Sequence, residues 1–170
     1  MTMSGSVRRK LIAAAGGGSM LIATLFLGGK EGAEGRTYKA YQDVAGVRTV
    51  CDGHTGSDII SGRQYSDSDC DRLLQNDLRS VKKVVDGVVK VPLSEYQRAS
   101  LYSFAYNIGP SAFTRSTLLK KLNAGDRAQA CEELRRWVYA GGIKWRGLMH
   151  RRDMERALCL AESSDDLADK

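Results

Sequence analysis

The sequence predicts an α+β protein in which a small β-hairpin region precedes a mainly helical lobe and follows an N-terminal membrane helix. Three observations support this prediction. β-Branched residues alternate around a Gly-containing turn between residues 38 and 52. Apolar residues then recur at helical spacing through most of the remaining chain. Residues 11–29 form a run of nineteen residues without a charge. Strands followed by helices are the order typical of α+β proteins.

The uncharged run from Leu11 to Gly29 is long enough to cross a bilayer. Nineteen residues at the helical rise span about 29 Å, close to the roughly 30 Å thickness of the hydrocarbon core. Its composition makes it a marginal anchor, because only seven positions are strongly apolar and five are Gly. Bases at positions 8–10 precede it, which predicts a cytoplasmic N-terminus over residues 1–10 and an exported body.

A cleaved secretory signal peptide would begin in the same way and is the alternative. The run exceeds the about 7 to 15 apolar residues usual for a signal peptide, which favours a retained anchor. Cleavage after Ala33-Glu34-Gly35 would remove the Glu34 carboxylate, whereas cleavage after Leu27-Gly28-Gly29 would spare it. A buried core helix is a third interpretation, which the flanking charges and the absence of a polar face weaken.

Short-range signals define the elements of the body. Strands are predicted at Tyr38–Tyr41 and Val47–Asp52, joined by a turn at Asp43–Gly46, and Gly53-His54-Thr55-Gly56 ends the hairpin. Capping boxes at Ser66/Asp69 and Ser94/Gln97 predict the starts of two helices, the second of which stops at Gly109-Pro110. Two or three further helices follow, around Thr117–Asn123, Arg127–Tyr139 and Gly147–Leu160. Residues 30–162 would form one domain, and residues 163–170 a solvated acidic tail.

The charge of the body argues against a nucleic-acid partner. The chain has 26 Lys and Arg against 20 Asp and Glu, but four of these bases, Arg8, Arg9, Lys10 and Lys30, lie within the first 30 residues. The remainder holds 22 bases against the same 20 acids, and no basic-aromatic platform appears in it. We therefore expect no nucleic acid to bind.

Four cysteines fit an exported body, because oxidising compartments favour disulfides. We favour pairing Cys51 with Cys70 and Cys131 with Cys159, since each bond would join neighbouring elements, although the sequence leaves three pairings open. A metal site and a nucleophilic Cys51 are the alternatives. No C-x-x-C spacing is present, and only two histidines could assist as ligands. We expect neither a metal nor another cofactor.

Two carboxylates and a hydroxyl could converge at the hairpin. Glu34, Asp43 and Thr49 are spaced nine and six residues apart. In glycoside hydrolysis one carboxylic acid protonates the leaving oxygen and a second carboxylate activates water, which a hydroxyl can help to hold. The spacing alone is weak evidence, because with 20 acids in 170 residues such a pair often arises by chance and each could be a surface charge.

The wider sequence resembles the phage-type lysozymes, the endolysins that open bacterial cell walls. E-(x)8-D-(x)5-T, from Glu34 to Thr49, is followed by G-H-T-G, by A-Y-N-I-G at 105–109, by L-R-R-W-V-Y-A-G-G at 134–142 and by G-L-M-H-R-R-D-M-E at 147–155. The resemblance covers residues 34–160. The N-terminal bases, the Gly/Ala-rich run and the Glu shortly after it are similar to those of the signal-anchor-release (SAR) endolysins. The run contains no Cys, so we expect release without disulfide exchange.

The resemblance implies a lysozyme-like fold and a muramidase that hydrolyses the β-1,4 bond between N-acetylmuramic acid and N-acetylglucosamine with inversion. Glu34 would be the general acid, and Asp43 with Thr49 would place the attacking water. Substrate contacts are expected from three further side chains, Tyr41, Asn107 and Trp137.

The other conspicuous side chains near these motifs have structural interpretations. His54 matches a histidine whose role is more structural than catalytic. Trp137 and Tyr139 could stack on sugars, but at helical spacing such residues are more often part of the core. Arg151 and Arg152 could pair with carboxylates near the cleft or lie on a solvated helix face.

The expected partners follow from the same resemblance. A monomer would act on peptidoglycan, reach the host inner membrane through the host secretion machinery, be held there by residues 11–29 and later escape into the periplasm to lyse the host. A membrane-tethered wall-binding module without catalysis is the alternative from another class. A lytic transglycosylase is a third option, which would use one acid without a water-placing partner. The trio Glu34, Asp43 and Thr49 favours the hydrolase.

Overall fold

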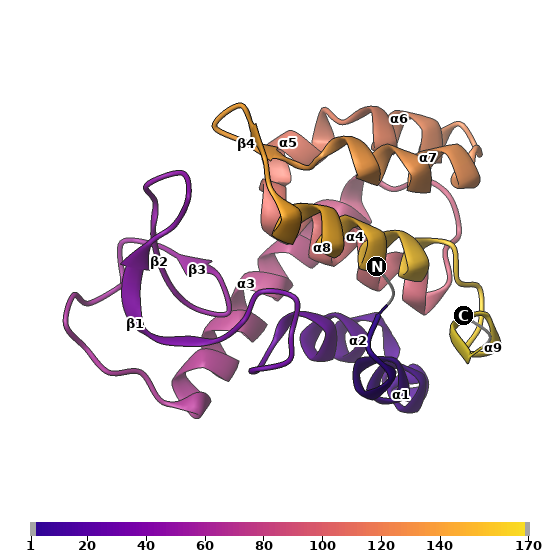
Figure 1. Cartoon of the computed structure of the whole chain (residues 1–170). Coiled ribbons are helices and arrows are strands. Elements are labelled where there is room, and N and C mark those ends of the chain that lie inside the picture. Colours follow the sequence, from indigo (N-terminus) through magenta and orange to yellow (C-terminus); the bar gives the residue numbers. More distant parts are fainter. Residues whose placement is uncertain (1–2, 169–170) are drawn as a thin grey trace.

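The computed structural model describes residues 3–168, and Figure 1 shows a small antiparallel sheet on one side of α3 and most of the helices on the other. This arrangement confirms the predicted α+β class. The elements in chain order are α1 (Gly5–Ala13), η1 (Ala15–Gly17), α2 (Gly18–Leu27), β1 (Thr37–Gln42), β2 (Arg48–Cys51), β3 (His54–Thr55), α3 (Asp67–Val88), α4 (Glu95–Ile108), α5 (Pro110–Thr114), α6 (Thr117–Asn123), α7 (Arg127–Glu133), η2 (Leu134–Arg136), β4 (Tyr139–Ala140), β5 (Ile143–Lys144), α8 (Arg146–Cys159) and α9 (Asp165–Ala168).

The predicted hairpin is present as β1 and β2, with Tyr41 opposite Thr49 in the antiparallel register. A third strand, β3, pairs with β2 and gives the sheet order β1-β2-β3. This third strand lies where the hairpin was predicted to end, because two residues are too short to show an alternation of apolar and polar side chains. Gly46, at φ +75°, supplies the left-handed conformation that the turn between β1 and β2 requires.

Helices α3 and α4 begin where the capping boxes predict. The Ser66 hydroxyl accepts from the Asp69 N–H and the Ser94 hydroxyl accepts from the Gln97 N–H, and both capping boxes are complete. The apolar face of α3 is buried through Leu74, Leu78, Val81 and Val85. Local hydrogen bonding therefore fixes these helix starts, and core packing selects the face that turns inward.

Three features of the helical lobe differ from the prediction. A short helix, α5, follows Gly109, because Pro110 at its first position lacks only an N–H that would be unpaired there in any case. The helix expected over Arg127–Tyr139 ends at Glu133, and Tyr139 instead pairs with Lys144 across a two-glycine turn. The expected solvated tail contains α9, whose Leu167 is buried in the core. One apolar residue in an acidic segment was too weak a signal to predict that contact.

The N-terminal run is bent and packed on the body. Figure 1 shows α1 and α2 beside one another beneath α4, and a 47° bend separates α1 from Ala15–Leu27. Among residues 3–168 no single helix is long and apolar enough to cross a membrane, although these two together meet the length and hydropathy. Gly18, at φ +75°, lies at the break. The expected single span of residues 11–29 is therefore two helical pieces in this conformation.

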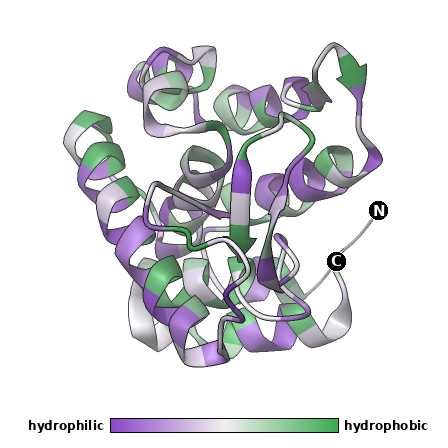
Figure 2. Ribbon diagram, turned by 90° about the vertical axis from the view of Figure 1, so that its left-hand side faces the viewer, coloured by the Kyte–Doolittle hydropathy of each residue, from purple (hydrophilic) through white to green (hydrophobic). Residues whose placement is uncertain are grey.

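Residues of the run form part of the main hydrophobic core. Leu11, Ile22, Phe26 and Leu27 are each at most 1% exposed, whereas Leu21 is 42% exposed. Figure 2, viewed from the side of the sheet, shows hydrophobic and hydrophilic residues alternating along the helices. The run thus has one buried face and one exposed face, as in a helix of a globular protein.

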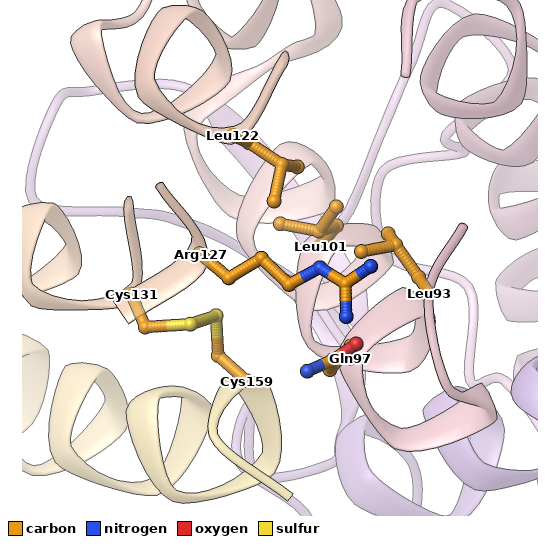
Figure 3. A pocket seen from close by; sticks show the side chains of 7 residues that line it. All are labelled: Leu93, Gln97, Leu101, Leu122, Arg127, Cys131 and Cys159. Atoms are coloured by element: carbon orange, nitrogen blue, oxygen red, sulfur yellow. A yellow bond between two sulfur atoms is a disulfide. The ribbon is translucent and has the colours of Figure 1, made fainter. Parts of the chain in front are cut away.

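Both of the favoured disulfides are present. Cys51–Cys70 joins β2 to α3, and Cys131–Cys159 joins α7 to α8. Beside the second disulfide lies a small apolar cavity of about 10 Å³, across which the Arg127 side chain extends (Figure 3). This volume is about the minimum that admits one water molecule, so the cavity cannot hold a sugar.

Candidate active site

A cleft of about 580 Å³ opens between the β-hairpin and the C-terminal end of α4. Glu34, Asp43 and Thr49 all line it, together with residues 106–109 on the opposite side. The three side chains that sequence spacing linked only weakly therefore share one opening. A cleft between a sheet and a helical lobe, with a few polar groups facing each other, is the usual form of a small-molecule or polymer site.

Glu34 lies in the loop between α2 and β1, and its side chain is 16% exposed. Its carboxylate is paired with the guanidinium of Arg151 from α8, 117 residues later in the chain. Gly53 lies behind it, since a Cβ built on Gly53 would be 3.1 Å from Glu34 Cδ. The carboxylate is thus held between an arginine and a glycine backbone.

Arg151 belongs to a buried network beneath Glu34. Its Nε donates to Glu155 Oε1 at 2.9 Å, and its Nη2 donates to the Ser103 carbonyl at 3.0 Å. The Ser103 hydroxyl also donates to Glu155 at 2.6 Å. Glu155 is fully buried, and the charges and hydrogen bonds of two carboxylates outweigh burial and raise the pKa of Arg151. The structure thus favours pairing over a solvated role for Arg151, and its partner far away in sequence explains why spacing did not reveal it.

Asp43 and Thr49 occupy the turn and the second strand of the hairpin. Asp43 Oδ1 accepts from the N–H groups of Ala45 and Val47, both at 2.8 Å, which fixes the carboxylate on the cleft wall. The Thr49 hydroxyl donates to the Val47 carbonyl at 3.0 Å, so its lone pairs remain able to accept from water. The arrangement can hold a water molecule on the hairpin side of the cleft.

The expected substrate contacts divide into two groups. Tyr41 and Asn107 line the cleft, and the Asn107 side-chain oxygen accepts from Arg152, so its amide N–H groups can still donate to a ligand. Trp137 is not among the described residues that line this cleft. It packs edge-on against Phe104 instead, with ring centroids 5.4 Å apart. That position favours the core interpretation of Trp137.

The contacts of His54 indicate a structural role. Its Nδ1 lies 2.7 Å from Asp77 Oδ2, and its Nε2 lies 3.1 Å from Asp58 Oδ1. Burial disfavours the imidazolium, but the hydrogen bonds and charges of Asp77 and Asp58 outweigh it and raise the pKa of His54. No group of three or more potential metal ligands gathers among residues 3–168.

Tyr106 is a residue of the cleft that was not among the predicted site residues. Tyr106 lines the cleft, and its hydroxyl donates to the Asp52 carbonyl at 3.0 Å. Burial, with smaller contributions from nearby carboxylates, raises the pKa of Tyr106 well above its usual range, so it is a hydrogen-bond donor. Its position in the A-Y-N-I-G motif was the available signal.

Known proteins resemble this chain over nearly its whole length. Residues 31–155 match the family described as Phage lysozyme. A SAR-endolysin of Bacteriophage PS119 is 48% identical over 163 residues, covering 94% of this chain and 98% of that protein. A SAR-endolysin of Enterobacteria phage P21 is 47% identical over 161 residues, covering 93% and 98%. The solved muramidase domain of SpmX from Asticaccaulis excentricus is 26% identical, with a TM-score of 0.69 over 94% of this chain and 98% of that one. The chain therefore belongs to the phage lysozyme family, among relatives that are SAR-endolysins.

Proposed function

We propose that this protein is an endolysin muramidase that hydrolyses the β-1,4 bond between N-acetylmuramic acid and N-acetylglucosamine in peptidoglycan. Its family makes it a lysozyme, a glycoside hydrolase that lyses the host cell. The observation that carries the proposal for the site is the shared cleft, which Glu34, Asp43 and Thr49 all line. Two carboxylates that line one cleft are the groups that glycoside hydrolysis requires.

In the proposed reaction Glu34 donates its proton to the leaving glycosidic oxygen as the bond to the anomeric carbon breaks. Asp43 accepts a proton from a water molecule that Thr49 helps to hold, and the water oxygen bonds to the anomeric carbon from the opposite face. The product has inverted configuration, and one water is consumed for each bond cleaved. A transglycosylase would need no such water, so the water-holding side of the cleft favours hydrolysis.

The N-terminal run supplies the proposed control. We infer that residues 11–29 hold the protein at the host inner membrane with the N-terminus in the cytoplasm, and that release into the periplasm lets them pack on the body. Hydrocarbon tails are as apolar as Leu, so the apolar face of the run is kept away from water both in the membrane and on the body. Relative to water, burying Leu11, Ile22, Phe26 and Leu27 contributes on the order of 6 to 12 kcal/mol. Packing can therefore stabilise the released state.

Release also affects Glu34, because its loop is bonded to the end of α2. The Ala33 N–H donates to the Phe26 carbonyl at 2.8 Å, and the Glu34 N–H reaches the Leu27 carbonyl at 3.5 Å. At full extension Glu34 can be at most about 17 Å from Gly29. An inserted anchor would hold the acid at the lipid surface, away from Asp43 and Thr49.

Glu34→Gln tests the catalytic proposal. We expect the loss of at least about 1,000-fold in the rate of peptidoglycan hydrolysis, because the amide keeps the shape but cannot donate the proton. The assay is the clearing of purified peptidoglycan by the released, soluble protein, with product analysis for reducing rather than anhydro ends. Glu31→Gln is the matched control: Glu31 is 59% exposed in the same loop and pairs with Lys10. A Glu34→Gln protein with full activity would overturn the assignment.

A further inference from the structure

Asp52 is a buried carboxylate that the proposed chemistry does not use. It is 1% exposed, and it directly precedes Gly53, the residue behind Glu34. A buried carboxylate is costly unless hydrogen bonds and an opposite charge compensate for its lost hydration. The partners of Asp52 therefore indicate what it holds in place.

These partners lie at both ends of the loop that carries Glu34. Asp52 Oδ1 accepts from the Gly29 N–H at 3.0 Å, directly after α2. Its Oδ2 accepts from Arg36 Nη2 at 2.7 Å, just before β1, and both of its oxygens lie 3.1 Å from Arg36 Nε. One carboxylate thus closes residues 29–36 into a loop. The hydrogen bonds to Asp52 raise the pKa of Arg36 above its ordinary value, so the guanidinium stays charged.

The backbone of Asp52 is fixed as well. Its carbonyl accepts from the Tyr106 hydroxyl of α4, and the disulfide at Cys51 holds the preceding residue to α3. Asp52 is therefore a rigid point on the body, whereas Gly29 is the end of the N-terminal run. The bond between them requires the end of α2 to lie on the body.

We propose that Asp52 is a positioning residue, which fastens the Glu34 loop to the hairpin and does so only when α2 is docked. This proposal rests on the proposed function of Glu34 and deepens it. Among the described residues, Asp52 makes no hydrogen bond to the side chain of Glu34, Asp43 or Thr49. It acts through Gly29, Arg36 and the neighbouring Gly53.

The test compares Asp52→Asn and Asp52→Ala with Asp71→Asn. Asp71 also pairs with Arg36, at 2.6 Å, but it is 59% exposed and is the matched control for losing one acid from Arg36. In Asp52→Asn the volume is kept, and Arg36 retains Asp67 and Asp71, so the protein should fold. Circular dichroism at the assay temperature establishes that each variant is folded.

The readouts are kcat and KM on soluble peptidoglycan fragments, together with hydrogen exchange of the Gly29 amide by NMR. For both Asp52 variants we expect kcat to fall about 10- to 100-fold with KM unchanged, because a displaced acid affects turnover more than binding. The Gly29 amide should lose protection in Asp52→Ala. Asp71→Asn should match the wild type in both readouts.

Three results would overturn the positioning role. These are an unchanged kcat in folded Asp52→Asn and Asp52→Ala, a change confined to KM, or an equal loss in Asp71→Asn. Failure of the proposed function looks different, because the wild-type protein itself would then release no product in the same assay.

Discussion

At Gly53 a side chain would crowd the Glu34 carboxylate, which is proposed to do the chemistry. The residue has φ +88°, and a Cβ there would lie 3.1 Å from Glu34 Cδ. We expect Gly53→Ala to cost about 1 to 2 kcal/mol of stability through backbone strain and also to lower kcat about tenfold or more by displacing Glu34. The measurements are thermal unfolding and peptidoglycan turnover.

Gly62 provides the control for that prediction. It has φ +78°, and a Cβ there would have no neighbour within 4 Å. Gly62→Ala should therefore show a similar loss of stability with normal turnover. If the two variants lose activity equally, backbone strain alone explains the effect and the contact with Glu34 is irrelevant.

The pair of His54 and Asp77 predicts how stability depends on pH. The folded-state pKa of His54 is raised, so protonated His54 stabilises the fold below its unfolded pKa of about 6.5. This contribution is lost as the pH rises through the raised folded value. In Asp77→Asn a hydrogen bond to His54 can remain while the charge is removed.

We therefore expect Asp77→Asn to be less stable than the wild type by about 1 to 2 kcal/mol at pH 5.5 to 6, with a smaller difference near pH 9. Urea unfolding at both pH values measures this. A difference that grows with pH would show that the ion pair is not its origin. Arg72→Gln, which breaks an ion pair with Asp69 on the same helix without touching His54, is the control.

Among the elements, the break between α1 and α2 distinguishes the docked run from a membrane helix. Gly18 adopts φ +75° there, whereas a continuous span needs a right-handed helical conformation at every position. Gly18→Ala should disfavour the bent form by about 1 to 2 kcal/mol and favour the straight helix by nearly 1 kcal/mol. We expect a larger share of the protein to stay in the membrane fraction after the membrane potential is collapsed.

Gly16→Ala is the matched control for this element. It adds the same methyl group to the run, but Gly16 has no positive φ and a Cβ there would meet nothing within 4 Å. Both variants gain helix propensity and hydrophobicity equally. Equal retention of the two variants would assign the effect to hydrophobicity and not to the bend.

At the scale of the whole molecule, short-range signals predicted more than long-range ones. The hairpin and the two capped helices follow from spacing and turn chemistry over short stretches of chain, whereas the trio of Glu34, Asp43 and Thr49 rests on the resemblance, because its spacing alone is weak evidence. The partner of Glu34 lies 117 residues away, and no local pattern identifies it. The N-terminal run was ambiguous, because apolar residues spaced for lipid are also spaced for a core. The flanking charges that argued against a core helix are accommodated at the surface, where Lys10 pairs with Glu31.

The packing of the run on the body allows a retained anchor to be distinguished from a cleaved signal peptide. If the run is removed, the core of the body loses Leu11, Ile22, Phe26 and Leu27, each at most 1% exposed. A chain that begins at Lys30 keeps Glu34 but lacks all four, along with the Gly29 N–H that Asp52 accepts. We expect this shortened chain to lose its cooperative unfolding transition and its peptidoglycan hydrolysis.

Two substitutions in the full-length chain calibrate this loss. Phe26→Ala, in the core, should cost about 3 to 5 kcal/mol, whereas Leu25→Ala, on the exposed face of the same helix, should cost within about 0.5 kcal/mol. Urea unfolding of the released protein measures both. A shortened chain as stable and active as the full-length protein would favour a cleaved signal peptide, because the run would then be dispensable once export is complete. A large loss of stability in Phe26→Ala with little loss in Leu25→Ala would instead mean that the anchor segment is part of the hydrophobic core of the folded enzyme.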